Sequence, residues 1–306
     1  MPAALTSRVH EVLASHGPLT GGELQREVGG ELFALWKACA TDGAVTTSVV
    51  GRRYVRLDRT VDGFARLSPS ILREFLTYTV VALNGQPDQL DDAARRLQAR
   101  IKAISRAKLR LAQRIADELT AQAVNDGADP DDFCVLVAGD IVYEMAHDVR
   151  RHESSTGGVV QGSDLDLVVL TRDEAPEATV TRLSEAIHRR KWLYLRNPAF
   201  QEEVDYVVKR FGRLVEQTQF DTFPHMVACK VFDEARFLAG NEHLHLAGRA
   251  LLQDRGVLDR LAELRARAIA GRDDRRELLL SIEGDALSAL GFRQFYNDDE
   301  AAEFEH

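Results

Sequence analysis

Three short apolar runs constrain the fold of this chain most, namely Phe133–Ala138, Leu165–Leu170 and Val204–Lys209. Each is mostly apolar and has the length of a strand, which is typical of strands in the interior of a sheet. A helical pattern over Thr179–Lys191 separates the last two runs. The sequence therefore predicts a mixed α+β protein built around a small mixed sheet.

Helical patterns account for most of the rest of this half of the chain. Residues Ile141–Val149 are expected to form a helix after the first strand, and Trp192–Leu195 a short strand. After Phe211 every segment is expected to be helical, and the expected helices are Phe220–Leu238, Glu242–Gln253, Val257–Ala270 and Asp273–Leu290.

The first sixty residues predict three short helices followed by a β-hairpin. Apolar side chains recur at helical spacing, and a β-prone stretch follows Asp42-Gly43. The expected elements are helices around Val9–Leu13, Glu23–Val28 and Glu31–Ala40, and strands Ala44–Val50 and Arg53–Leu57. This order resembles a winged helix-turn-helix domain over residues 1–60, with the third helix as the reader and the hairpin as the wing.

The expected wing is basic, but the expected reader helix is not. The wing carries Arg52, Arg53, Arg56 and Arg59. The third helix has Lys37 as its single base, whereas a helix that reads the major groove usually presents several basic or amide side chains. DNA binding and docking to a protein or to a neighbouring domain therefore both remain open.

Residues 61–130 predict a helical connector. Ser68-Pro69 has the pattern of an N-cap followed by proline at the first helical position, and this helix is expected to end at Asn84-Gly85. Leu90–Val124 predict one long helix, and the loop Asn125–Asp132 marks an expected domain boundary.

The long helix carries a series of basic side chains that no acidic one interrupts. The bases are Arg95, Arg96, Arg100, Lys102, Arg106, Lys108, Arg110 and Arg114. This pattern indicates either a solvated helix face or a surface that contacts the phosphate backbone of RNA or DNA.

The overall charge argues against a protein whose whole surface binds nucleic acid. The 306 residues include 48 acidic and 39 basic side chains, so the formal net charge is −9. This sign argues against a surface that binds nucleic acid or an anionic membrane all over, although it allows a local basic patch.

The three cysteines, Cys39, Cys134 and Cys229, fit no disulfide framework and no zinc spacing, and the N-terminus lacks a signal core. We therefore expect a cytoplasmic protein with buried free thiols and no membrane partner.

The most informative motif is GSDLDL, residues 162–167, at the start of the second expected strand. Residues two apart in a strand point to the same face, so Asp164 and Asp166 are expected to project together. Two adjacent carboxylates repel each other, and a bridging divalent cation such as Mg²⁺ explains the pair better than a structural role does. Asp205 interrupts the third apolar strand and would complete a cluster for two metal ions, with Glu203 as the reserve candidate.

This order of motifs resembles the nucleotidyltransferase superfamily of the DNA polymerase β type. The resemblance covers Phe133–Arg210 and rests on Gly139 after the first strand, the Ser163-Asp164-x-Asp166 run, and Asp205. It implies that Asp164 and Asp166 bind two Mg²⁺ ions and that Asp205 joins them and helps to activate an incoming hydroxyl. It also implies that Gly139 and Ser163 lie near the triphosphate of an NTP, for which ATP is the expected choice.

Two features depart from the family pattern. Asp140 stands where the family has Gly or Ser; it is a candidate nucleotide-binding residue by position, and it is expected either to bind metal or to cap the following helix. The segment Arg150–Gln161 lengthens the first motif, either as a mobile loop with phosphate-binding arginines or as a tolerated surface insertion.

Three further side chains are expected on one helix after the third strand, namely His225, Lys230 and Arg236. Lys230 is a candidate partner of the triphosphate, and an ion pair with Asp233 or Glu234 is its alternative role. His243 and His245 are expected as two helix-surface histidines, because no third metal ligand lies near them in the sequence.

These motifs predict a Mg²⁺-dependent nucleotidyltransferase that moves a nucleoside monophosphate from an NTP to a hydroxyl of a protein, an RNA or a small molecule. The expected segments are a winged helix (1–60), a helical connector (61–130), a nucleotidyltransferase core (131–215), and a helical C-terminal region with an acidic tail (216–306). The alternative is a winged-helix regulator whose transferase domain senses nucleotide without turnover.

Overall fold

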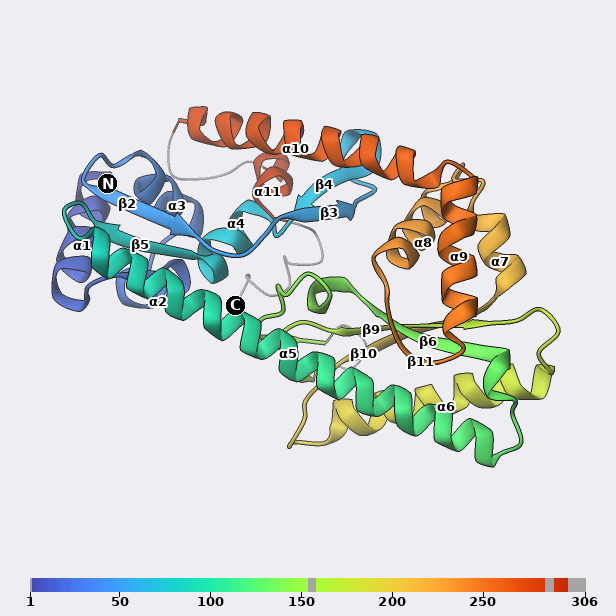
Figure 1. Ribbon diagram of the computed structural model, residues 1–306. Helices are drawn as coiled ribbons and strands as arrows, with labels where there is room; N and C mark the ends of the chain where they lie inside the picture. The colour runs from blue at the N-terminus through green and yellow to red at the C-terminus, as the bar shows by residue number, and fades with distance from the viewer. Residues whose placement is uncertain (1, 154–157, 284–288, 297–306) are drawn as a thin grey trace. The chain divides into compact units, whose positions relative to one another are not determined.

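The computed structural model describes residues 2–153, 158–283 and 289–296 and confirms a mixed α+β chain (Figure 1). The chain forms two compact units. Unit 1 comprises residues 1–101 and 265–306, and unit 2 comprises residues 102–264. This division cuts across the four segments expected from the sequence, because its boundaries fall inside the two long helices α5 (Pro87–Asn125) and α10 (Val257–Ser281).

Unit 1 begins with three helices that pack on a three-stranded antiparallel sheet. The helices are α1 (Pro2–His16), α2 (Gly21–Val28) and α3 (Leu32–Thr41). The sheet order is β1-β5-β2, with β1 at Leu19–Thr20, β2 at Val45–Val49 and β5 at Thr79–Leu83. Thr20 caps α2 with a capping box, since its Oγ accepts from Glu23 N while Glu23 accepts from Thr20 N. The apolar core of this unit also includes Leu279 of α10 and Phe295 of α11 (Ala289–Phe295).

The expected wing hairpin is wrong in its pairing. β2 pairs with β5, with Val45 opposite Leu83, whereas β3 (Tyr54–Leu57) pairs with β4 (Ala65–Ser68). The centre of β5 is fully buried. The buried strand β5, which is distant in the sequence, therefore pairs with β2 in place of β3, the partner that the turn at Gly51-Arg52 predicted.

The expected helix from Ser68 to Asn84 is also wrong in most of its length. The Ser68–Pro69 peptide is cis, and Ser70, whose Oγ accepts from Arg73 N at 3.0 Å, caps the short helix α4 (Ile71–Arg73). A π-helical turn, Glu74–Tyr78, follows and leads directly into β5. β5 contains Thr79, Val80 and Val81, and β-branched residues favour a strand, although the spacing of the apolar residues had indicated a helix.

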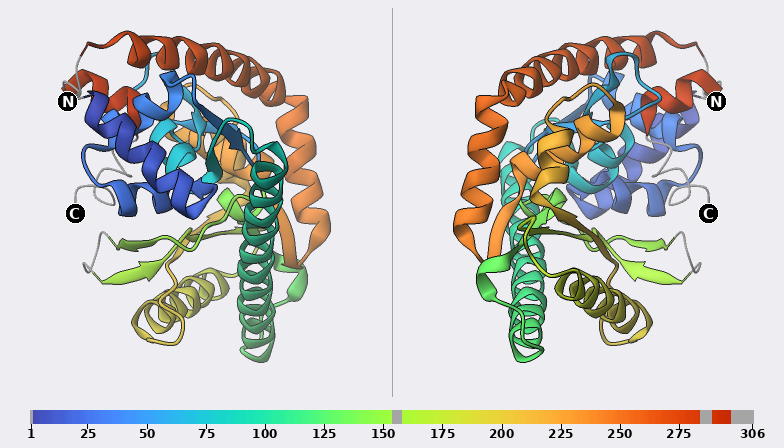
Figure 2. Two further views of the ribbon diagram at one scale, coloured as in Figure 1. Left: turned by 90° about the vertical axis from the view of Figure 1, so that its left-hand side faces the viewer. Right: turned by 90° about the vertical axis from the view of Figure 1, so that its right-hand side faces the viewer.

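Unit 2 is built around a four-stranded mixed sheet with the order β10-β9-β6-β11. The strands are β6 (Phe133–Ala138), β9 (Leu165–Thr171), β10 (Val204–Arg210) and β11 (Arg236–Gly240). β10 is parallel to β9, and the other pairs are antiparallel. The helices are α5, α6 (Glu177–Arg196), α7 (Phe211–Gln217), α8 (Phe223–Glu234) and α9 (Glu242–Asp254). Figures 1 and 2 show α5 and α6 on one face of the sheet and α7, α8 and α9 on the other.

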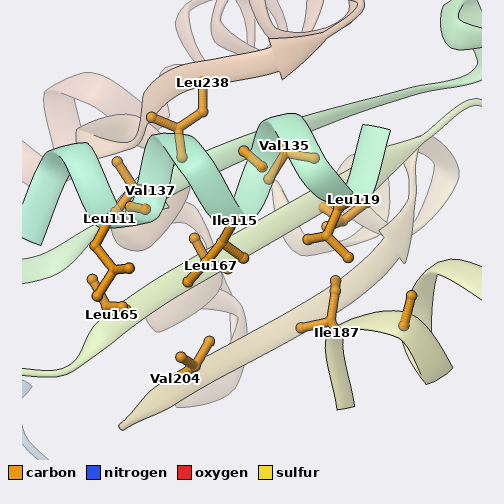
Figure 3. Packing of buried hydrophobic residues seen from close by; sticks show 14 of the residues in the cluster. Leu111, Ile115, Leu119, Val135, Val137, Leu165, Leu167, Ile187, Val204 and Leu238 are labelled. Carbon is orange, nitrogen blue, oxygen red and sulfur yellow. The ribbon is translucent and has the colours of Figure 1, made fainter. Parts of the chain in front are cut away.

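The main core of unit 2 lies between the sheet and the α5 and α6 face. Leu111, Ile115 and Leu119 of α5 pack on the strands, as Figure 3 shows. Leu165 and Leu167 of β9 belong to this core. The alternate residues of β9, which include Asp166, therefore face the side covered by α7, α8 and α9.

The three expected strands and the long helix are confirmed, but four local predictions are wrong. Trp192–Leu195 is part of α6, and Arg236–Gly240 is the edge strand β11 rather than the end of a helix. Ile141–Val149 is not an α-helix: Gly139–Ile141 form a single 3₁₀ turn, Glu144 takes a left-handed φ of 57°, and Ser163 Oγ accepts from His147 N. α10 runs unbroken through the break that had been expected at Gly271, and the acidic tail from 297 to 306 lies outside the described residues.

The segment Arg150–Gln161 contributes a hairpin in place of an irregular loop. Its described residues form β7 (Arg150–His152) and β8 (Val159–Gln161), which pair antiparallel. Figure 2 shows the hairpin as two green strands. This pairing gives Arg151 a defined position, which matters for the site below.

Lys209 of β10 is a buried cation and is 8% exposed. Its Nζ donates to Gln217 Oε1 at 2.8 Å and lies 5.6 Å from the centre of the Phe232 ring. Burial, opposed by Cys229 and assisted by Arg213, lowers the pKa of Lys209 to about 8. The folded protein must therefore hold a buried ammonium at pH 7.

We expect Lys209→Met to raise the free energy of unfolding at pH 7 by about 1–3 kcal/mol. Between about pH 8 and pH 10.4 the unfolded chain binds the lysine proton more tightly than the folded one, so wild-type stability rises with pH. The advantage of the variant is therefore expected to fade over this window. Urea unfolding at pH 7 and at pH 10.5 measures it, with Lys102→Met as the control. A lower free energy of unfolding than wild type at pH 7, or a gain of the same size at pH 7 and at pH 10.5, would contradict the expectation.

Candidate active site

Strand register brings the predicted carboxylates together. Asp205 of β10 lies opposite Asp166 of β9, and Asp166 lies opposite Ala138, the last residue of β6. Asp164 immediately precedes β9 and shares the face of Asp166 by strand alternation. The three carboxylates and Gly139 therefore meet at one edge of the sheet, and the side chains of Asp164 and Asp205 are partly exposed there.

Gly139 is required by the close approach of Asp166. Its φ is +76°, and a Cβ built on it would overlap Asp166 Oδ2. Both the left-handed conformation and the missing side chain are thus needed at the end of β6. The close approach of Asp166 therefore explains why a glycine stands at position 139.

We expect Gly139→Ala to lower the free energy of unfolding by about 2–4 kcal/mol, because a left-handed alanine is strained and the new methyl group must displace Asp166. Gly127→Ala is a matched control, since Gly127 has a φ of +85° and no atom lies within 4 Å of its built Cβ. That control is expected to cost about 1–2 kcal/mol. Thermal unfolding of both variants measures the difference, and equal losses would show that the contact with Asp166 has no energetic effect.

Two basic side chains neutralise the carboxylates. Arg151 of β7 pairs with Asp164 Oδ1, and its Nη2 lies 2.7 Å from Glu203 Oε2. Lys191 Nζ of α6 donates to Asp205 Oδ1 at 2.7 Å. Sequence reasoning missed Lys191 entirely and anticipated Arg151 only as one of several arginines in the insertion. Both contacts bridge elements that are distant in the sequence.

These ion pairs have electrostatic consequences at the site. Burial by itself would lower the pKa of Lys191, but the bond to Asp205 and the charges of Asp205, Glu203 and Glu153 raise it. Burial raises the pKa of Glu203, a shift that Arg151 opposes and Asp205 increases. The acidic side chains therefore make the site negative, and Arg151 and Lys191 offset part of that charge.

Ser163 and Asp140 interact with each other. Ser163 is buried, and its Oγ donates to Asp140 Oδ2 at 2.9 Å. Asp140 caps no α-helix, because it lies inside the single 3₁₀ turn Gly139–Ile141 and residues 142–149 form no helix. The preceding Gly162 has a φ of +68°, and a Cβ there would overlap the carbonyl oxygen of His147, so the turn that positions Ser163 also requires glycine.

Gly139 and Tyr143, just after β6, lie beside α8. Lys230 Nζ pairs with Glu234 Oε2 at 2.5 Å and lies 5.5 Å from the centre of the Tyr143 ring. Glu234 also accepts from Tyr143 Oη at 2.5 Å and from Gly139 N at 3.4 Å. The ion pair that had been the alternative role of Lys230 is thus present. Its ammonium also lies close to Gly139 through the shared partner Glu234.

The remaining predicted side chains have other surroundings, although Arg236 lies opposite Val137 of β6, near the end of the sheet that carries Gly139. His225 Nδ1 contacts Asp221 Oδ1 at 2.7 Å near the start of α8, and Arg236 lies on β11 rather than on a helix with them. His243 is exposed, but the expectation for His245 is wrong, because it is buried between the rings of Phe232 and Phe237. Burial lowers the pKa of His245.

Most bases of the long helix are exposed, but Lys108 is not. It is buried in unit 2, donates to Gln161 O at 2.9 Å and pairs with Glu202. Arg106, Arg110 and Arg114 are exposed. In the expected wing, Arg53 pairs with Glu74 within unit 1. Lys108 and Arg53 therefore have structural partners, which the pattern of bases did not reveal.

The carboxylate edge has the donor chemistry of a Mg²⁺ site. Oxygen ligands from a few carboxylates are what Mg²⁺ prefers, and two carboxylates of this edge already bind the side-chain cations Arg151 and Lys191. In their present rotamers, no three His, Cys, Asp or Glu side chains of residues 2–153, 158–283 and 289–296 converge closely enough to hold a metal ion. Metal binding would therefore require these carboxylates to exchange their side-chain cations for the ion.

Comparison with protein-family models, with curated proteins and with solved structures finds no match to this chain. Among the helices that the structure describes, none combines the length and the apolar character needed to cross a membrane.

Proposed function

We propose that unit 2 is a Mg²⁺-dependent nucleotidyltransferase that transfers a nucleoside monophosphate from an NTP to a hydroxyl acceptor and releases pyrophosphate. The observation that carries the proposal is the register of Asp205 opposite Asp166, directly beside Gly139. Arg151 and Lys191 pair with two of these carboxylates, and a divalent cation would take their place. The grouping matches the pattern in the sequence that resembles the polymerase β type superfamily.

Asp164, Asp166 and Asp205 would hold the metal. Bound Mg²⁺ supplies electrostatic stabilisation of the phosphate charge that develops during transfer. The acceptor oxygen would form a bond to the α-phosphorus while the bond to the bridging oxygen of pyrophosphate breaks, and Asp205 would accept the hydroxyl proton. Lys191 must release Asp205 for this step, because its ammonium occupies Oδ1.

The triphosphate would lie along the first motif. The backbone of Gly139 and the ammonium of Lys230 are the candidate contacts, because both are linked to Glu234 at the end of β6. Arg151, which pairs with Asp164, would turn to a phosphate oxygen of the bound triphosphate. An arginine on a paired strand is suited to this exchange, since its fork matches the geometry of both carboxylate and phosphate groups.

The arrangement of strands and helices in unit 1 supports an N-terminal winged helix as a further part of this proposal. The order α1-β1-α2-α3-β2-β5 and the sheet order β1-β5-β2 are consistent with a winged helix in which residues 50–78 form an insertion between the last two strands. We infer that this unit recruits a partner, nucleic acid or protein, to the transferase unit.

Transfer of label from α-³²P-NTPs tests the proposal. The protein is incubated with each of the four NTPs, Mg²⁺ and, in turn, RNA, protein extract and small hydroxyl compounds. Labelled product and pyrophosphate are expected with at least one NTP, ATP first, and EDTA is expected to abolish both. Nucleotide binding without transfer to any acceptor, unchanged in Asp164→Asn, would instead support a nucleotide sensor.

A further inference from the structure

The C-terminal half of α6 and the loop after it are unusually basic and aromatic. Residues 186–201 contain four Arg or Lys side chains, one histidine and three aromatic side chains, and they contain no acid. Leu193, on the outer side of the helix, is 59% exposed. Tyr194 is buried and Phe200 packs against it, whereas Trp192 is half-buried and His188, Arg189 and Arg196 are exposed. This segment therefore presents cations and one partly exposed indole ring at the surface of unit 2.

Trp192 is the centre of this arrangement. Its Nε1 donates to His188 Nε2 at 2.9 Å, and the two rings lie 6.0 Å apart. The guanidinium of Arg196 lies 4.6 Å from the centre of the Trp192 ring. Tyr206 Oη of β10 lies 3.4 Å from His188 Nδ1. We call these four residues, His188, Trp192, Arg196 and Tyr206, the Trp192 surface.

The charges around the Trp192 surface favour an anionic ligand. Arg196 is exposed, and Arg189 is mostly exposed, with Glu185 3.8 Å away. Arg190 is more enclosed and lies 3.5 Å from Glu118 of α5. The exposed pair of Arg189 with Glu185 contributes little and leaves Arg189 available to a phosphate, whereas Arg190 also donates to Gln122 and to Ala186 O.

The Trp192 surface adjoins the acceptor end of the carboxylate edge. Lys191 precedes Trp192 in α6, and its Nζ bonds to Asp205. Tyr206 follows Asp205 in β10. Tyr206 and Asp205 point to opposite faces of β10, so the Trp192 surface is linked to the carboxylate to which the proposed function assigns the acceptor hydroxyl through Lys191, at the edge strand of the sheet.

We propose that the Trp192 surface binds single-stranded nucleic acid and that this strand is the acceptor of the transferred nucleotide. Bases stack on exposed aromatic rings while neighbouring cations follow the phosphate backbone, and this combination defines sequence-tolerant single-strand binding. The assignment of the acceptor rests on the proposed function, whereas binding at the Trp192 surface does not depend on it.

Tryptophan fluorescence tests binding directly. The chain has two tryptophans, and Trp36 is 4% exposed in the core of unit 1. Titration with an oligouridine of about ten nucleotides is expected to quench the fluorescence of Trp192 saturably. The affinity is expected to fall as salt rises, because phosphate contacts release counterions. The Trp36→Phe variant isolates the signal, and anisotropy of a labelled oligonucleotide checks the result with Trp36 in place.

Variants locate the contact. Trp192→Ala and Arg196→Gln are each expected to weaken binding by about tenfold or more, and Trp192→Phe by less, because phenylalanine still stacks. Leu193→Ala is the matched control on the same helix turn and is expected to bind as wild type does. Binding that is unaltered by Trp192→Ala, or the absence of saturable quenching and of an anisotropy change, would overturn the proposal.

The outcomes separate this inference from the proposed function. Asp166→Asn is expected to bind the oligonucleotide with wild-type affinity, since Asp166 lies outside the Trp192 surface. Saturable binding without label transfer from any NTP would leave the surface standing and refute the transferase. Label transfer to a protein or a small molecule, with no oligonucleotide binding, would refute the Trp192 surface and leave the transferase standing.

Discussion

Asp166→Asn is expected to lower the rate of nucleotidyl transfer by about a thousandfold or more. Asp166 is the central carboxylate of the edge, because it has Ala138 on one side and Asp205 on the other. Asparagine keeps the size of the side chain but removes the charge that would bind the metal. An interaction made only in the transition state lowers kcat and kcat/KM equally when it is lost.

Rates are measured under single-turnover conditions, together with the free energy of unfolding. The variant is expected to unfold within about 1 kcal/mol of wild type, because relief of carboxylate repulsion offsets the loss of polar contacts. Asp117→Asn, at an exposed position of α5, is the control and is expected to keep wild-type activity. A rate for Asp166→Asn within tenfold of wild type would remove Asp166 from the site.

The second large effect is expected in unit 1, where Glu74→Ala should lower the free energy of unfolding by about 3–5 kcal/mol. Glu74 is 7% exposed and accepts from Arg53 at 2.6 and 2.8 Å. Arg272 Nη2 of α10 lies 3.0 Å from it, and that side chain is almost fully buried. Removal of the carboxylate leaves a buried guanidinium without its counter-ion.

The pH dependence of stability checks the origin of this effect. Burial by itself would raise the pKa of Glu74, but Arg53 and Arg272 lower it below its usual value of 4.5. Its stabilising effect is therefore complete above about pH 4.5 and is lost as the pH falls through the lowered pKa. Urea unfolding between pH 7 and pH 3 is expected to show this loss in wild type and not in Glu74→Ala. Glu277→Gln, exposed on the same helix α10, is the control.

A loss below 1 kcal/mol in Glu74→Ala would contradict this account of unit 1. The double variant Glu74→Leu with Arg272→Met provides a further check, because it replaces the buried charges with apolar groups of similar size. It is expected to recover much of the stability lost in the single variant.

The sheet that carries the carboxylates was predictable because its information is local. Two of the three strands are apolar runs without strong helical periodicity, and the two-residue spacing of Asp164 and Asp166 is itself a strand signal. Asp205 could be placed beside them only through the order of motifs. Its register with Asp166 is a property of the parallel pairing of β9 and β10.

The errors arose where non-local partners decide the structure. β2 pairs with β5 across a stretch that contains another strand pair, and no local pattern marks that choice. Ile141–Val149 has helical spacing, but the chain turns there so that Ser163 Oγ can accept from His147 N. Arg151 and Lys191 are ordinary surface cations in the sequence and become partners of the carboxylates only through tertiary packing.

Comparison of two labels in the same ATP tests the central claim most directly. Wild-type protein, Mg²⁺ and acceptor are incubated with α-³²P-ATP or with γ-³²P-ATP. The account predicts that the α label enters the product, that the γ label leaves as pyrophosphate, and that Asp166→Asn abolishes both. Label from γ-³²P-ATP in the product, or α-label transfer that persists undiminished in Asp166→Asn, would contradict it.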